Sequence, residues 1–176
     1  KSIDLSRSIQ VNFKTQVQEW KNILLNFNNP DKYHSYKDKF EKQIHKVNEL
    51  LFHLKNHLKT THIEDQALLD NIQTFETEFN EVNKKYQEGL LLHEQSNANV
   101  EEVNKYVHGI DRKPTEAVNI VVENIHKSVD LISQHNIEKK TYTISTILWF
   151  SLIIIILNII LRYLIIKDIL SSVNQT

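Results

Sequence analysis

One segment constrains the fold of this chain more than any other, because there is no charged residue between Thr141 and Leu161. Most of the segment, residues 144–161, reads ISTILWFSLIIIILNIIL. At ~1.5 Å per residue, a helix of this length covers about 30 Å, the thickness of the hydrocarbon core of a bilayer. A buried helix of a soluble protein would need a large surrounding core, which the polar remainder does not offer. The sequence therefore predicts a transmembrane helix over residues 141–161, with membrane lipid as a partner.

The charges that flank this segment do not orient it. Lys139 and Lys140 precede it, and Arg162 and Lys167 follow it. Positively charged residues favour the cytoplasmic side of a membrane helix, and here the two sides are equal.

The composition excludes several classes of protein. Two glycines and two prolines cannot supply the turns of a β-sandwich, a barrel or a doubly wound sheet. Twenty-one basic against 22 acidic side chains give no electrostatic footprint for nucleic acid, and no cysteine is present for a disulfide or a thiolate site. No phosphate-binding loop, nucleophile elbow or zinc-protease motif is found, so we predict neither an enzyme nor a cofactor.

Residues 1–140 carry apolar residues at steps of three and four, which is typical of amphipathic helices. The pattern is broken at 28–31, 59–62 and 96–113, which leaves four segments of about 27, 30, 32 and 28 residues. Equal lengths with short joints predict an all-α, antiparallel, up-down-up-down four-helix bundle over residues 1–140. Its fourth helix would be continuous with the transmembrane helix at 141–161, and residues 162–176 would form a further helical segment.

The joints carry helix-capping signals. Asn29 can cap a helix with Pro30 at its first position, and Pro114 is well placed to open the fourth helix. Thr61 and Glu64 have the spacing of a capping box.

The predicted topology fixes the order of the joints along the bundle. The 28–31 and 96–113 joints would lie at one end, here called the distal end, and the 59–62 turn near the membrane. The same count brings residue 1 to the level of the membrane and predicts an earlier membrane span upstream of it.

Trp20 is the first candidate for a binding site. It lies on the inward stripe of the first helix, and Gly89 takes a stripe position at about the same level, where it can leave room for the indole. Large-against-small packing explains this pair, and so does a small-molecule pocket in the distal half walled by Trp20, Tyr33 and Tyr36.

Asp111 and Arg112 are the second candidates, beside Pro114 at the distal end. Arg112 can hold a ligand carboxylate by a two-pronged charge-assisted bond. The alternative is that it pairs with a carboxylate such as Glu19 or Asp31, while Asp111 caps the fourth helix.

Nine histidines raise the question of a metal. His53 and His57 have the i, i+4 spacing that lets two imidazoles share an ion, but no carboxylate follows one turn further along. We predict no metal site there, and we expect His93 to be a core or pocket histidine.

Three stretches carry a family resemblance: FKTQVQEWKNILL at 13–25, NPDKY at 29–33 and GIDRKPTE at 109–116. They resemble the periplasmic four-helix-bundle sensory domain of bacterial methyl-accepting chemotaxis proteins, although Asn26-Phe27 replaces the usual Arg-Gly. Residues 162–176 resemble the start of a HAMP relay helix, with Ile169 in the place of its proline.

The resemblance implies a function, a location and partners. It implies a chemoreceptor in the bacterial inner membrane, with the bundle in the periplasm and downstream signalling domains in the cytoplasm. The expected partners are a second copy of the chain and a small-molecule ligand or periplasmic binding protein. The same kind of input module is attached to diguanylate cyclases and sensor histidine kinases, and a membrane-tethered bundle without a ligand remains a third interpretation.

Overall fold

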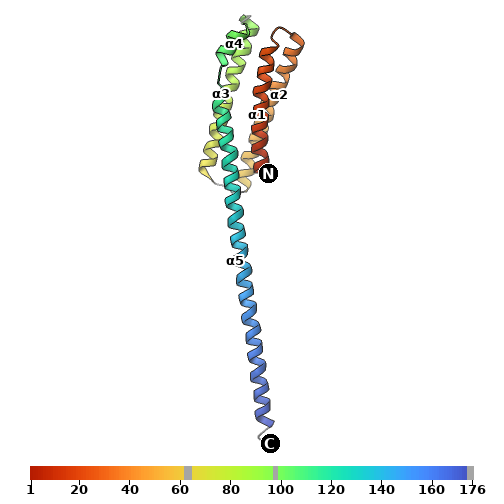
Figure 1. The fold of residues 1–176 in the computed structure, drawn as a ribbon, viewed down its shortest axis with the longest axis vertical. Helices are drawn as coiled ribbons and strands as arrows, with labels where there is room; N and C mark the ends of the chain where they lie inside the picture. Colours follow the sequence, from red (N-terminus) through yellow and green to blue (C-terminus); the bar gives the residue numbers. More distant parts are fainter. Residues whose placement is uncertain (62–64, 97–98, 174–176) are drawn as a thin grey trace. The chain divides into compact units, whose positions relative to one another are not determined.

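The structure is a computed structural model that describes residues 1–61, 65–96 and 99–173, the side chains of 96 and 168–173 excepted. The described residues are all-helical and contain no strand, which confirms the predicted fold class. Figure 1 shows the helices in chain order. They are α1 (Ser2–Leu25), α2 (Pro30–Thr60), α3 (Gln66–Ser96), α4 (Val100–Val107) and α5 (Arg112–Val173).

The chain divides into two compact units, residues 1–129 and 130–176. The first unit is the helical bundle, made of α1 to α4 and the part of α5 up to Val129. The boundary at residue 140 between the bundle and the membrane segment stays a prediction. Within it, α1 and α2 lie side by side along their lengths, joined by a short turn (Figure 1).

Apolar stripes of the helices form the core of the bundle. Phe13 of α1 meets Phe75 and Phe79 of α3 edge-on, with ring centroids 5.8 and 6.0 Å apart. All three side chains are fully buried. Each such burial contributes about 1.5–3 kcal/mol, so the spacing of three and four found in the sequence is what holds the helices together.

One polar pair interrupts this core. Gln16 of α1 is fully buried and donates from Nε2 to Oδ1 of Asn83 on α3. Its own Oε1 is buried without a hydrogen-bond partner. The pair fixes the register of α1 against α3, because a shift of either helix would leave more buried polar atoms unpaired.

The helix ends follow the capping signals closely. Asn29 accepts a hydrogen bond from the backbone N–H of Lys32 at 3.2 Å, with Pro30 at the first position of α2, as the sequence predicts. The capping box expected from Thr61 and Glu64 lies outside the described residues. A full capping box that we did not predict opens α4, where the side chains of Asn99 and Glu102 bond each other's backbone N–H groups.

The helix α5 begins at Arg112, two residues before the predicted opening at Pro114. Proline is tolerated here because the first N–H groups of a helix have no partner within it. The peptide of Thr115 makes the first intrahelical bond, to the carbonyl of Asp111 at 3.2 Å.

Two contacts within the bundle agree with the predicted order of the joints along it. Phe27 in the α1–α2 turn stacks on His93 near the end of α3, with centroids 3.7 Å apart. Asp65, just before α3, accepts a hydrogen bond from Ser128 at 3.1 Å. The α1–α2 turn and the end of α3 are therefore at one end of the bundle, and the start of α3 is near residue 128.

The second unit contains the apolar part of α5. Within Arg112–Lys167 an 18-residue window reaches a mean hydropathy of 2.6, and none of it is buried. No other helix among the described residues is long and apolar enough to cross a membrane. The amide of Asn158 donates to the carbonyl of Ile154 at 2.8 Å, so its N–H is satisfied within its own helix.

Candidate ligand-binding site

Trp20 anchors the distal half of the bundle. It is 3% exposed, stacks on Tyr86 with centroids 4.3 Å apart, and makes a tilted contact with Phe40 at 5.8 Å. A Cβ atom on Gly89 would lie 3.2 Å from Cη2 of the indole. This confirms the prediction that Gly89 leaves room for the Trp20 ring.

A cavity of ≈ 300 Å³ opens beside this aromatic stack, between α1, α3 and the α4–α5 joint. Its lining residues are Trp20, Lys21, Leu24, Tyr86, Asn104, Val107, His108, Gly109, Asp111 and Arg112. Its volume is near the lower limit of small-molecule sites, which are about 300–1,000 Å³.

Three of the five predicted site residues meet in this cavity: Trp20, Asp111 and Arg112. The other two, Tyr33 and Tyr36, do not line it. Tyr33 is buried and donates from its hydroxyl to Glu94 at 2.7 Å. Tyr36 is half-buried against the core, with the ammonium of Lys39 at 4.9 Å from its ring centroid.

The turn before α5 shapes the rim of the cavity. Gly109 has φ = +72°, a conformation that other residues adopt only with strain. The peptide N–H of Arg112 donates to the carbonyl of Gly109 at 3.3 Å, and Nε of Arg112 lies 3.5 Å from where a Cβ of Gly109 would be. The tight turn therefore folds the Arg112 side chain back over Gly109.

Of the two interpretations of Arg112, the structure does not show the one in which it pairs with a carboxylate such as Glu19 or Asp31. Among the described residues no ion pair or side-chain hydrogen bond joins these groups, and Glu19 instead accepts from Asn22 at 3.1 Å. The turn at Gly109 explains the difference, since it holds Arg112 over its own joint.

Asp111 stands immediately before α5, but its side chain makes no hydrogen bond to the helix N-terminus among the described contacts. Its backbone carbonyl accepts from the N–H and the hydroxyl of Thr115 instead. Burial raises the pKa of the Tyr86 hydroxyl, and the negative charge of Asp111 raises it further. The Tyr86 hydroxyl is therefore a neutral group in a site that carries a carboxylate.

A larger groove of ≈ 440 Å³ lies on the other side of Gly109, along α3. Four of its charged side chains form two ion pairs: Lys85 with Glu88 at 3.6 Å, and Lys113 with Glu78 at 3.8 Å. These two pairs neutralise part of the charge of the groove, which Glu81 and Lys84 also line.

A separate polar cluster ties α2 to α3 at the distal end. The carboxylate of Glu94 accepts from the ammonium of Lys37 and the hydroxyl of Tyr33, both at 2.7 Å. These two donors, Lys37 first, hold the pKa of Glu94 below its usual value. Burial, and then the same carboxylate, raises the pKa of Tyr33. Tyr33 is therefore part of a structural clamp.

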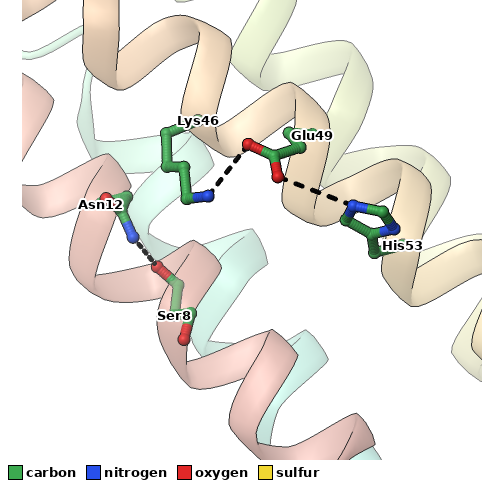
Figure 2. Close-up of polar contacts among 5 residues, drawn as sticks. All are labelled: Ser8, Asn12, Lys46, Glu49 and His53. Carbon is green, nitrogen blue, oxygen red and sulfur yellow. Dashed lines mark hydrogen bonds and ion pairs between the residues drawn. The ribbon is translucent and has the colours of Figure 1, made fainter.

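His53, one member of the histidine pair considered for metal binding, lies beside Glu49 of its own helix (Figure 2). Nε2 of His53 lies 3.6 Å from one oxygen of Glu49, whose other oxygen accepts from Lys46 at 2.9 Å. In the described part of the chain no three His, Cys, Asp or Glu side chains are grouped so that they could hold an ion.

Sequence reasoning missed most of the cavity wall, since seven of its ten lining residues were not proposed as site residues. Tyr86, Val107 and His108 were not proposed as site residues, although Tyr86 and Val107 belong to apolar stripes. Tyr86 lies one helical turn before Gly89 on the same stripe. Considering this neighbouring turn as well as Gly89 would have identified the ring that stacks on Trp20.

Comparison with known proteins gives one informative similarity. The chain is 27% identical over 121 residues to the methyl-accepting chemotaxis protein CtpH of Pseudomonas aeruginosa. The match covers 69% of this chain and 20% of that protein, so the chain spans about one fifth of the relative's length. No protein-family model matches the chain. No solved structure matches it either. The similarity supports a chemoreceptor-type sensory role.

Proposed function

We propose that this chain is the ligand-sensing and transmembrane signalling region of a bacterial chemoreceptor. The observation that carries the proposal is the similarity to a methyl-accepting chemotaxis protein over 121 residues. It is supported by an all-helical bundle with a cavity at Trp20, Asp111 and Arg112, and by an apolar helix with the length and composition of a membrane span.

The mechanism that we propose uses α5. Arg112 and Asp111, at the rim of the cavity, stand at the start of the same 62-residue helix that contains the apolar segment. A ligand that binds one arrangement of α5 more tightly than another shifts the equilibrium between the two. A helix shift of ~1–2 Å is enough for such a switch, and it would reach a HAMP relay that begins at residue 162.

The same proposal gives the protein a location and partners. The bundle would lie in the periplasm and residues 162–176 in the cytoplasm, with the receptor in the bacterial inner membrane as a homodimer. The ligand would be a small molecule in the cavity; a periplasmic binding protein docked on the bundle is the alternative. The output would be non-enzymatic, passing to signalling domains that follow the relay.

A signalling chimera tests the proposal. Residues 1–176 replace the corresponding region of the Pseudomonas aeruginosa relative, and receptor methylation and swimming bias are measured with a rich culture medium as an unfractionated stimulus. We expect D111N and R112Q to change the response while the melting temperature stays nearly constant, because substitutions at exposed or half-exposed sites usually shift stability by less than ~0.5 kcal/mol. The control is D38N, at an exposed position of α2.

Two results would redirect the interpretation. If the variants change the melting temperature and never the output, the chain is a membrane-tethered structural bundle. If the gene is found to encode a diguanylate cyclase or a histidine kinase domain after Thr176, the sensing role is kept and the output becomes catalytic.

A further inference from the structure

We infer that the core of the bundle binds a water molecule between α1 and α2, which donates one hydrogen bond to Oε1 of Gln16 and the other to Oε1 of Gln43. The inference does not depend on the proposed sensory function. It follows from two buried oxygens that lack a donor, from the level at which they lie in the bundle and from the sides of the helices that carry them.

The two oxygens are acceptors without a donor among the described residues. Gln16 is fully buried, and its Nε2 donates to Asn83 of α3, whereas its Oε1 is buried and accepts no hydrogen bond. Oε1 of Gln43 is buried and accepts none either, although the residue as a whole is half-buried. A buried carbonyl oxygen that has lost its hydrogen bonds to bulk water destabilises the fold unless another donor replaces them. Each of the two oxygens therefore requires a donor.

The two glutamines lie at the same level of the bundle. Helices α1 and α2 lie side by side and run antiparallel, because a short turn joins them (Figure 1). The rings of Trp20 on α1 and Phe40 on α2 are 5.8 Å apart, which fixes the register of the two helices. Gln16 precedes Trp20 by four residues and Gln43 follows Phe40 by three. These steps are ~6 Å and ~4.5 Å toward the same end of the bundle, so the levels differ by less than ~2 Å.

On α2, Gln43 lies on the side away from α3. Lys55 marks the side that faces α3, because its ammonium pairs with Glu76 of that helix. At ~100° per residue, Lys55 lies ~60° from Phe40 in one direction around the helix, and Gln43 lies ~60° from it in the other. Since Phe40 points into the core, Gln43 is on the flank of α2 that faces α1.

On α1, Gln16 lies on the side away from α5. Gln10 marks the side that faces α5, because its amide donates to Asn119 at 2.7 Å. Gln10 lies ~80° from Trp20 in one direction around α1, and Gln16 lies ~40° from it in the other. Gln16 is therefore on the flank of α1 that faces α2, opposite Gln43.

A water molecule provides what the two oxygens require. It has two hydrogens to donate, one to each acceptor, and it is small enough to lie between two packed helices. An ammonium ion would also donate, but a charge buried beside neutral amides, without a carboxylate, is strongly unfavourable. With the water in place, Gln16 links three helices at one level: it bonds Asn83 of α3 directly and Gln43 of α2 through the water.

The substitution Gln43→Met tests the inference by the sign of its effect. Methionine keeps the length of the side chain and removes the oxygen. If water bridges the two glutamines, Q43M takes an acceptor from the water, and the melting temperature of the whole chain in nanodiscs should fall by ~2–5 °C. If Oε1 of Gln43 has no partner, its removal should raise the melting temperature instead.

Two further variants make this measurement specific. In a Q16L background the bridge is already lost, so adding Q43M should leave the melting temperature unchanged or raise it. The control is Q87M, at an exposed position of α3, which should have no effect.

A crystal structure of the whole chain, at a resolution that shows ordered water, gives the direct test. We expect one water molecule within ~2.5–3.0 Å of Oε1 of both glutamines. A rise in melting temperature for Q43M, an equal fall with and without Q16L, or a crystal structure with no water between the two oxygens would overturn the inference. None of these results bears on the proposed function, which the response of the chimera tests separately.

Discussion

The contact between Gly89 and its neighbours makes a quantitative prediction for the substitution Gly89→Ala. A Cβ atom at this position would lie 3.2 Å from Cη2 of Trp20 and 3.3 Å from a methyl carbon of each of Val103 and Val107. All three distances are a few tenths of an ångström shorter than an ordinary van der Waals contact. The side chains of Trp20, Val103 and Val107 must therefore shift to make room for the new methyl group.

Two opposing terms decide the size of the effect. Replacing glycine by alanine inside a helix gains about 1 kcal/mol of helix propensity, whereas overfilling a packed core costs about 1–3 kcal/mol. Trp20 is held between Tyr86 and Phe40, so the smaller helix α4, which carries Val103 and Val107, has to give way. We expect a net loss of about 1 kcal/mol, or roughly 3–5 °C in melting temperature for a bundle of this size.

Thermal unfolding followed by circular dichroism measures this change, and a second substitution identifies its cause. In a W20F background the largest clash is removed, so the cost of Gly89→Ala should fall. Gly109→Ala is the matched comparison: its Cβ would meet nothing closer than 3.5 Å, and its cost of about 1–2 kcal/mol would come from the positive φ alone. A rise in melting temperature for Gly89→Ala in the unmodified background would refute the packing argument.

Other substitutions test the core and the distal clamp. Trp20→Ala should cost ~3–5 kcal/mol in urea unfolding, because a large and almost fully buried side chain is removed. Gln16→Leu should cost about 1–3 kcal/mol by leaving Asn83 unpaired, and adding N83L should recover most of that loss; a double variant less stable than Q16L would contradict this reading of the pair. Since Lys37 and Tyr33 lower the pKa of Glu94, its stabilising contribution is complete above about pH 4.5 and is lost as the pH falls further. The melting temperature of E94Q should therefore fall less steeply below that pH than that of the unmodified chain, and parallel curves would count against the clamp.

The helices could be predicted because their causes are local. Steps of three and four, Pro30 after Asn29 and the break near residue 60 fix where helices begin and end. The start of α5 differs by two residues from the prediction, because a proline fits any position of a first turn that needs no N–H partner. Counting residues along the stripes placed Gly89 beside Trp20, since a helix has a fixed rise per residue.

The cavity could be predicted only in part. Counting residues along a helix gives the level of a side chain in the bundle, but it does not show which neighbour the side chain faces. For this reason the sequence predicts Tyr33 as a wall of the pocket, whereas its hydroxyl bonds Glu94. The direction of the Arg112 side chain depends on the positive φ of Gly109. Because a single backbone angle leaves no periodic pattern in the sequence, this part of the cavity rim could not be predicted.

The central claim is that this chain carries a signal from one side of a membrane to the other, which requires the bundle and residue 167 to lie on opposite sides. The chain has no cysteine, so single substitutions D38C and K167C provide specific probes, both at exposed positions. Intact cells with a permeabilised outer membrane are treated with a maleimide that cannot cross the inner membrane. We expect D38C to be labelled at once and K167C only after the inner membrane is opened. Labelling of both positions in intact cells, or protection of both, would contradict the account.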